Sequence, residues 1–216
     1  MLTSIIRNRL ALAATAALLA AAASAVLWRS GEQDIAQTPA ISASKLSFGG
    51  RFTLVDHSGK IVTDRDYDGL YKLIFFGFTN CPAVCPTTLQ TVTIALEELG
   101  PAADRVKPLF ITIDPEHDTP KVMAEYVGNF DRRIVGLTGT PQQIAAAAKL
   151  YHVHYKKVRD KDGSEQIEHT ATLYLMAPDG ALLAHIPPEA SPRKMAELIR
   201  MEFGKALGAQ ASKAQP

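Results

Sequence analysis

The chain has little cysteine and almost no net charge. Of its 216 residues only Cys81 and Cys85 are cysteines, too few for a disulfide-rich small domain or a four-cysteine zinc site. It has 23 Lys and Arg against 22 Asp and Glu, and this formal charge of +1 gives no indication of nucleic-acid binding. Apolar residues make up 47%, which is enough for a buried core and argues against a disordered chain.

An uncharged run, residues 10–28, follows Arg7 and Arg9. As a helix it spans about 28 Å, close to the ~30 Å of a bilayer's hydrocarbon core. The preceding arginines favour a cytoplasmic N-terminus, residues 1–9. We therefore expect a single-pass anchor in the inner membrane, with the rest of the chain on the periplasmic side. A cleaved signal peptide is the alternative, because the small residues 23–25 are typical of a cleavage site.

Composition divides the remaining chain into three parts. Residues 29–45 are polar and lack periodicity, as in a tether, and residues 205–216 predict a flexible tail. Residues 46–204 form the expected domain, because strand and helix patterns alternate there. This alternation predicts an α/β fold with a partly parallel sheet flanked by helices. The strands are expected at residues 72–78, 106–113, 134–137, 172–176 and 181–186.

The helix starts share a pattern in which a hydroxyl residue precedes proline. Thr119-Pro120, Thr140-Pro141 and Ser191-Pro192 each place an N-cap oxygen before a proline at the first helical position. A fourth helix is expected to begin at Pro86, with Cys85 in the cap position. The unpaired N–H groups of that helix end should favour the thiolate over the thiol at both cysteines.

Cys81 and Cys85 lie four residues apart in one strand-to-helix turn. This spacing is compatible with metal binding, with thiol redox chemistry and with a structural disulfide. Two thiolates and one imidazole suit copper, as Cu(I) or Cu(II), whereas zinc needs a fourth ligand that is not evident. His117 and His169 are equal candidates for the imidazole when judged by their positions alone.

The histidines lie in contrasting predicted surroundings. His117 is expected in the loop after the strand 106–113, and His169 is expected to open the strand that ends at residue 176, after a charged loop over residues 156–168. His152 and His154 alternate as in a strand and are expected to share one face, where they would add a weak second metal site.

Three segments of this chain, taken in order, resemble the Sco/SenC family of copper chaperones. They are Phe78-Thr-Asn-Cys-Pro-Ala-Val-Cys-Pro-Thr-Thr-Leu89, Asp114-Pro-Glu-His-Asp-Thr-Pro120 and His169-Thr-Ala-Thr-Leu-Tyr-Leu-Met-Ala-Pro-Asp-Gly180. The similarity covers about residues 48–203. It implies a thioredoxin-like fold with a mixed central sheet, tethered by an N-terminal transmembrane helix, and a role in cytochrome c oxidase assembly.

The resemblance also assigns residues. It implies that Cys81, Cys85 and His169 are the copper ligands, and that Asp114 supports the site or docks a partner. The family typically has arginine where this chain has His117, so a fixed positive charge becomes a pH-dependent one at the expected docking surface.

The function that the resemblance implies is delivery rather than catalysis. The expected partners are the copper-site subunit of cytochrome c oxidase, a copper donor protein and a thiol reductant that keeps Cys81 and Cys85 reduced. A thiol–disulfide oxidoreductase that acts on the partner's cysteines is the main alternative, because a thiolate at a helix N-terminus is also a nucleophile. A thiol peroxidase and an interaction domain with an inert disulfide remain as weaker alternatives.

Overall fold

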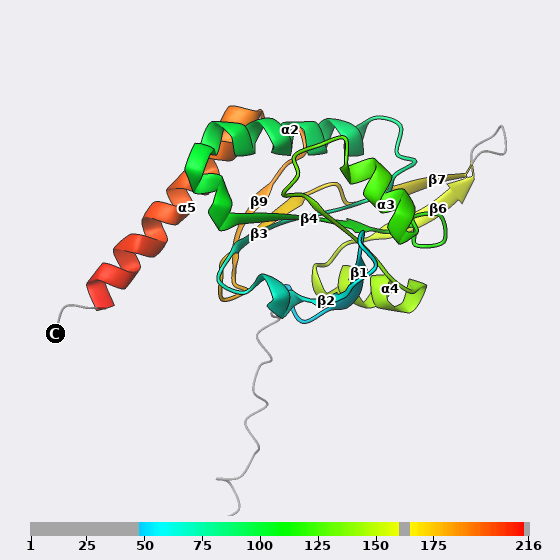
Figure 1. Cartoon of the computed structure of the whole chain (residues 1–216), viewed down its shortest axis with the longest axis horizontal. Coiled ribbons are helices and arrows are strands. Elements are labelled where there is room, and N and C mark those ends of the chain that lie inside the picture. The colour runs from blue at the N-terminus through cyan, green and yellow to red at the C-terminus, as the bar shows by residue number, and fades with distance from the viewer. Residues whose placement is uncertain (1–47, 160–164, 214–216) are drawn as a thin grey trace, which may run out of the picture. The chain divides into compact units, whose positions relative to one another are not determined.

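The computed structural model describes residues 48–159 and 165–213. Their centre is a seven-stranded sheet with the order β2-β1-β5-β4-β3-β8-β9 (Figure 1). β3 (Tyr71–Gly77), β4 (Val106–Thr112) and β5 (Val135–Thr138) run parallel to one another. The outer strands pair antiparallel, which makes the sheet mixed, as predicted. These outer strands are β1 (Thr53–Asp56), β2 (Ile61–Thr63), β8 (Leu173–Met176) and β9 (Leu182–Ile186).

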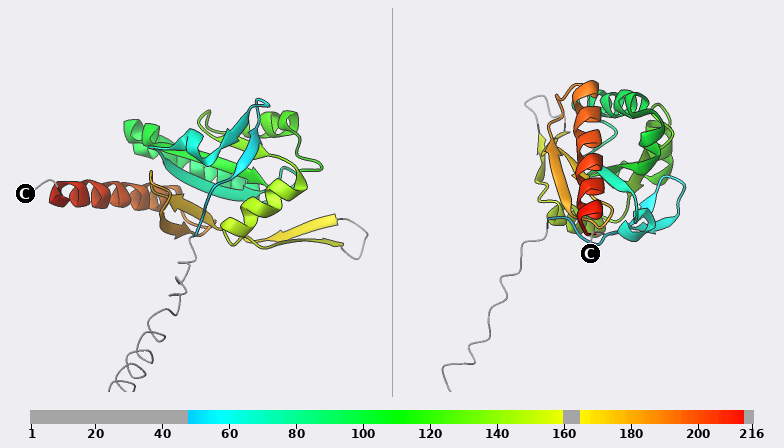
Figure 2. Two further views of the ribbon diagram at one scale, coloured as in Figure 1. Left: turned by 90° about the horizontal axis from the view of Figure 1, so that it is seen from below. Right: turned by 90° about the vertical axis from the view of Figure 1, so that its left-hand side faces the viewer.

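Helices cover both faces of the sheet (Figures 1 and 2). α2 (Val84–Leu99), α3 (Pro120–Val127) and α5 (Pro192–Lys213) lie on one face, and α4 (Pro141–Leu150) lies on the other. Two short 3₁₀ helices, η1 (Asp64–Tyr67) and η2 (Gly100–Arg105), complete the described helices.

The central strand β3 shows why its sequence is an unbroken apolar run. All seven of its residues are buried because helices cover both of its faces. Phe75 stacks on Phe110 of β4, with ring centroids 5.9 Å apart, while the next residue, Phe76, turns to the α4 side and contacts Tyr151 at 5.6 Å. The apolar runs at β3 and β4 therefore report two-sided burial, and both strand predictions are confirmed.

Three of the four predicted helix starts are confirmed. The hydroxyl oxygens of Thr119 and Thr140 accept the backbone N–H groups of Val122 and Gln143, and that of Ser191 accepts the N–H of Lys194. The prediction for α2 is wrong, because Ala83 occupies the cap position and Cys85 is the second residue of the helix. The first N–H groups of a helix have no partner within the helix, so a proline, which lacks this group, fits any position of the first turn. Pro86 therefore indicates that α2 begins nearby but does not determine its first residue.

A hairpin replaces the charged loop that was expected over residues 156–168. β6 (Tyr155–Arg159) and β7 (Glu165–His169) pair antiparallel as a separate two-stranded sheet, and His169 ends β7 instead of opening β8. Oppositely charged residues face each other across the strands, as at Lys156 and Glu168, and Tyr155 and Ile167 on the other face pack half-buried against the core. The shared face predicted for His152 and His154 is also wrong, because His152 lies in a turn with a φ of 52°.

The predicted membrane anchor, residues 10–28, and the tether, residues 29–45, lie outside the described residues. Among residues 48–159 and 165–213, no helix combines the length and the apolar character that a membrane span requires. α5 continues past Gly204 to Lys213, so most of the predicted tail has a helical backbone.

Candidate metal centre

Cys81 lies in the loop between β3 and α2, and Cys85 lies in the first turn of α2. Both are free cysteines, with Cys81 half-buried and Cys85 buried. The backbone N–H of Cys85 donates to the sulfur of Cys81 over 3.3 Å. The helix N-terminus thus directs an N–H at the Cys81 sulfur, and this contact brings the two cysteines together in one turn.

Cys85 is held in an apolar environment that opposes its ionisation. A β-carbon placed on Gly77 would lie 2.7 Å from the Cys85 sulfur and 2.8 Å from the Phe110 ring, so the glycine leaves room for the thiol. Burial raises the pKa of the Cys85 thiol and outweighs a hydrogen bond from the Phe78 backbone that lowers it. The prediction that the helix end favours the thiolate is therefore wrong for Cys85, which must lose a proton to bind a metal.

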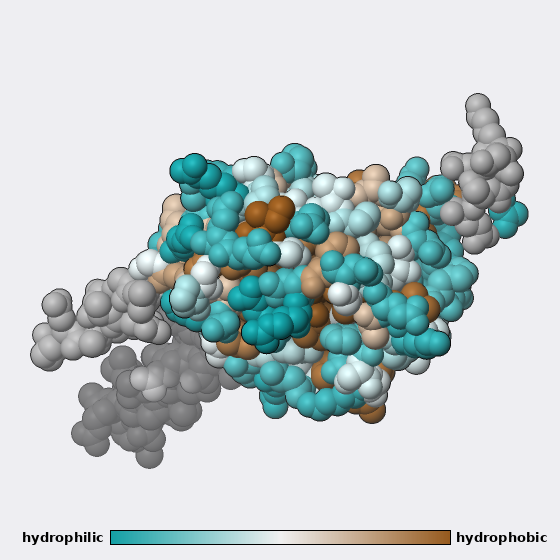
Figure 3. All heavy atoms as spheres, turned by 45° about the horizontal axis from the view of Figure 1, so that its top comes forward, coloured by the Kyte–Doolittle hydropathy of each residue, from teal (hydrophilic) through white to brown (hydrophobic). Residues whose placement is uncertain are grey.

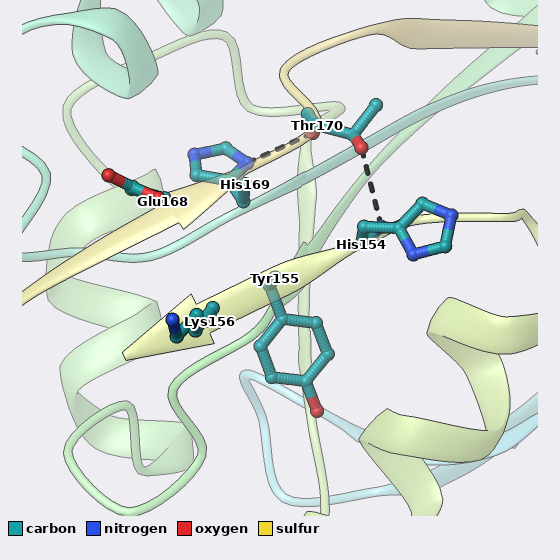
Figure 4. Close-up of a pocket in the computed structure, with 6 residues that line it drawn as sticks. All are labelled: His154, Tyr155, Lys156, Glu168, His169 and Thr170. Atoms are coloured by element: carbon teal, nitrogen blue, oxygen red, sulfur yellow. Dashed lines mark hydrogen bonds between the residues drawn. The ribbon is translucent and has the colours of Figure 1, made fainter. Parts of the chain in front are cut away.

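His169 ends β7 with one ring nitrogen already in use. Its Nδ1 donates to the carbonyl oxygen of Thr170 over 2.9 Å, which leaves the lone pair on Nε2 (Figure 4). Burial lowers the pKa of His169, although the Thr170 carbonyl acts to raise it, so the ring is neutral at pH 7. Its ring points away from that of His154, which lines the same open pocket of about 370 Å³. A neutral, oriented imidazole is the form that ligates copper.

Phe78, the first residue after β3, has contacts with all three predicted ligands. Its ring meets the His169 ring edge-on, with centroids 5.9 Å apart. Its carbonyl accepts the N–H of Cys81, and its backbone is hydrogen-bonded to the Cys85 thiol. In the described part of the chain, no three His, Cys, Asp or Glu side chains come close enough to hold one ion, so the three-ligand assignment stays a prediction.

The loop between β4 and α3, residues 113–119, contains an important residue that the sequence analysis missed. The Asp118 carboxylate is 1% exposed and accepts hydrogen bonds from the Thr79 backbone, the Thr79 hydroxyl and the Thr112 hydroxyl. Thr79 lies two residues before Cys81, so Asp118 fixes the start of the cysteine loop. The only signal in the sequence was the place of Asp118 in the segment 114–120, because its burial depends on the fold.

Asp114 and His117 lie in the same loop and contact each other. The Nδ1 of the exposed His117 lies 2.7 Å from Oδ2 of the buried Asp114. Oδ1 of Asp114 has no hydrogen bond but lies 3.3 Å from Nζ of Lys157 in β6, a charge contact without hydrogen-bond geometry. Lys157 also pairs with Glu116, at 2.6 Å. Asp114 therefore joins the 113–119 loop to the hairpin that carries His169.

The surface beside the cysteine loop is apolar. Val84 is 44% exposed, although polar residues cover most of the face shown in Figure 3. It lines an open pocket of about 320 Å³ together with Ala83, Thr87, Thr88, Pro188 and Glu189. The pocket therefore adjoins the end of the cysteine loop and the first turn of α2.

Comparison with known proteins identifies the family. The SCO1/SenC family model matches residues 41–204. The chain belongs to the SCO1/SenC family. A SCO2-like protein of Rickettsia conorii is 36% identical over 176 residues, which is 81% of this chain and 86% of the relative.

Solved structures of Sco proteins support the same assignment. Bradyrhizobium japonicum ScoI with copper bound is 43% identical, with a TM-score of 0.66 over 71% of this chain and 99% of that one. BsSco, described with a disulfide switch and as a member of the Sco family of cytochrome c oxidase assembly proteins, is 26% identical, with a TM-score of 0.59 over 74% of this chain and 95% of that one. The mixed sheet with its helices is thus the thioredoxin-like Sco fold, as the sequence resemblance implied.

Proposed function

We propose that this chain binds copper through Cys81, Cys85 and His169 and delivers it to the copper-site subunit of cytochrome c oxidase. The observation that carries the proposal is the position of Phe78, which contacts the His169 ring with its side chain and both cysteines with its backbone. Two free thiols and one neutral imidazole are a soft donor set that suits copper. The copper-bound structure of a relative that is 43% identical supports the same cargo.

Delivery requires a site that a partner can reach. The half-buried Cys81 and the exposed residues Pro82, Ala83 and Val84 form an accessible edge of the cysteine loop. Ligand exchange would begin there, with a partner's Cys, His or Met side chain replacing one protein ligand at a time. Cys85 is inaccessible and would release the metal last.

The proposed location is the inner membrane, with residues 10–28 as the anchor and the copper-binding domain on the periplasmic side. Arg7 and Arg9 support this orientation, because positive charge favours the cytoplasmic side of a span. In the periplasm, a copper donor protein would load the site after a thiol reductant had reduced a Cys81–Cys85 disulfide.

Copper titration of the reduced protein against a competing chelator tests the ligand assignment. We expect Cys81→Ser, Cys85→Ser and His169→Ala each to weaken copper binding by at least tenfold. His154→Ala is the matched control, since this exposed histidine lines the same pocket with its ring turned away from His169. Full-affinity binding by His169→Ala or by Cys81→Ser would refute the assignment.

A second candidate function is thiol–disulfide exchange on a partner's cysteines. The disulfide switch described for BsSco and the contrast between an accessible Cys81 and a buried Cys85 favour it. Cys81 would attack the partner's disulfide, and Cys85 would then displace the partner from the mixed disulfide. His169 separates the two functions, because thiol exchange does not need an imidazole at that position.

Reduction of a model disulfide substrate tests this alternative. A substantial rate that is unchanged in His169→Ala and lost in Cys81→Ser would favour thiol exchange. Copper binding that depends on His169, together with a negligible reduction rate, would favour delivery.

A further inference from the structure

We propose that Lys157 is a positioning residue: its ion pairs with Asp114 and Glu116 fix the hairpin β6–β7 so that His169 faces the cysteine loop. The inference rests on the proposed copper function, because it assigns His169 its role as a ligand. Lys157 lies in β6 and acts by restraining the strand pair whose other strand, β7, carries His169.

Besides Lys157, two half-buried side chains of the hairpin, Tyr155 and Ile167, pack against the core, and Phe78 meets the His169 ring. β6 and β7 pair with each other and project beyond the seven-stranded sheet (Figures 1 and 2). Tyr155 lies opposite His169, and Lys157 lies opposite Ile167, one repeat further along the same face. An attachment at Lys157 therefore restrains the strand pair close to His169.

The partners of Lys157 belong to the 113–119 loop, which is hydrogen-bonded to the segment that leads to Cys81. Nζ of Lys157 lies 2.6 Å from Glu116 and 3.3 Å from the buried Asp114. Asp118 of the same 113–119 loop accepts hydrogen bonds from Thr79, just before Cys81. The Asp118 N–H also donates to the Asp114 carbonyl, so polar contacts join β6, the strand paired with the one that carries His169, to the loop that carries Cys81.

The chain offers a control one residue away. Lys156 is equally charged and exposed, but adjacent strand residues point to opposite faces. It lies opposite Glu168 and makes no ion pair among the described residues. Lys157→Met and Lys156→Met remove the same charge from the same strand and differ in whether the 113–119 loop is released.

The size of the effect follows from the kind of contact that is lost. Two partly exposed ion pairs together stabilise the attached hairpin by about fivefold in population. Copper affinity falls in proportion to the fraction of molecules in the competent arrangement. A fivefold shift lowers this fraction by at most fivefold, so we expect a loss of up to about fivefold in Lys157→Met, no loss in Lys156→Met and recovery in Lys157→Arg, which keeps the charge.

The first experiment needs no copper. In the full chain, NMR signals of the His169 ring and hydrogen exchange of the β6–β7 amides report how firmly the hairpin is held. Lys157→Met should shift the ring signals and speed exchange, whereas Lys156→Met should match the wild type. Because exposed ion pairs are screened by salt, raising the salt concentration should move the wild type toward Lys157→Met.

The second experiment measures copper affinity for the same variants, for Glu116→Gln and for Glu116→Gln combined with Lys157→Met. The double variant should lose less affinity than the two single variants together, because both substitutions remove the same Lys157–Glu116 ion pair. If neither the wild type nor any variant bound copper, the proposed function would be wrong. The NMR and hydrogen-exchange measurements on the hairpin would still test the positioning role of Lys157. Wild-type hairpin exchange in Lys157→Met, or equal losses in both lysine variants, would overturn the inference.

Discussion

At the residue scale, the buried carboxylate of Asp118 fixes the approach to the cysteines. Three donors from Thr79 and Thr112 converge on it, and a carboxylate supplies the acceptor lone pairs that they need. The sequence contained all three residues, but Thr79 and Asp118 are 39 positions apart, so only the folded chain shows that they meet.

The first prediction concerns the charge on Asp118. In Asp118→Asn one acceptor oxygen becomes an NH₂ donor that faces a hydroxyl or N–H donor, and we expect a loss of about 2 kcal/mol in the free energy of unfolding. Urea denaturation measures this loss. Asp68→Asn is the control, because Asp68 is exposed and the same substitution there should change stability by less than about 0.5 kcal/mol. Equal stability of both variants would contradict the role assigned to Asp118.

The second prediction concerns Gly77, which lies against the Cys85 sulfur. Gly77→Ala places a methyl group within 2.8 Å of both Cys85 and Phe110, and we expect a loss of about 1–3 kcal/mol from overpacking. Thermal unfolding of the two proteins measures it. Gly204→Ala in α5 is the matched control, since nothing lies near its added methyl and stability should be unchanged or slightly raised. A fully stable Gly77→Ala protein would show that the cysteine pocket is loose.

The third prediction gives the pH dependence of copper binding. The raised pKa of Cys85 keeps its proton in place at neutral pH, so copper must displace it and affinity should fall about tenfold per pH unit per proton as pH drops from about 8 to 6. The pKa of His169 is lowered, so its protonation weakens binding only below the ordinary histidine range near pH 6.5. Chelator competition at several pH values measures the slope, and a flat profile would exclude displacement of thiol protons.

At the element scale, the sequence predicted the strands that are buried on both faces, and it missed a hairpin whose strands are partly exposed to solvent. The apolar runs at β3 and β4 and the hydroxyl-proline helix starts have local causes, and the structure confirms them. The hairpin β6–β7 has charged residues on both strands and no strong apolar alternation, so its sequence is also typical of a loop. The start of α2 was misplaced because a proline fits more than one position of a first turn.

The fourth prediction tests a local cause of this kind. Thr140 and Gln143 form a capping box at the start of α4, in which each side chain bonds to the backbone of the other residue. We expect Thr140→Ala to lower the free energy of unfolding by about 1 kcal/mol in urea denaturation. Thr87→Ala, at an exposed site in the first turn of α2, is the control and should change it by less than about 0.5 kcal/mol. Equal effects would mean that the cap oxygen of Thr140 contributes nothing.

At the scale of the whole molecule, parallel strands explain why motifs far apart in the chain gather at one end of the sheet. β3 and β4 are neighbours, with Gly77 opposite Thr112, so the cysteine loop and the 113–119 loop leave the sheet side by side. Ligand sites of α/β folds form at such carboxyl ends. The general location of the candidate site could therefore be predicted from strand order, whereas the approach of His169 depends on the hairpin and on long-range ion pairs.

The direct test of the central claim is X-ray absorption spectroscopy at the copper edge on reduced, copper-loaded protein. We predict two sulfur neighbours and one imidazole nitrogen, with the nitrogen lost in His169→Ala and one sulfur lost in Cys81→Ser. A copper shell that lacks sulfur, or one that is unchanged when His169 is replaced, would contradict the account.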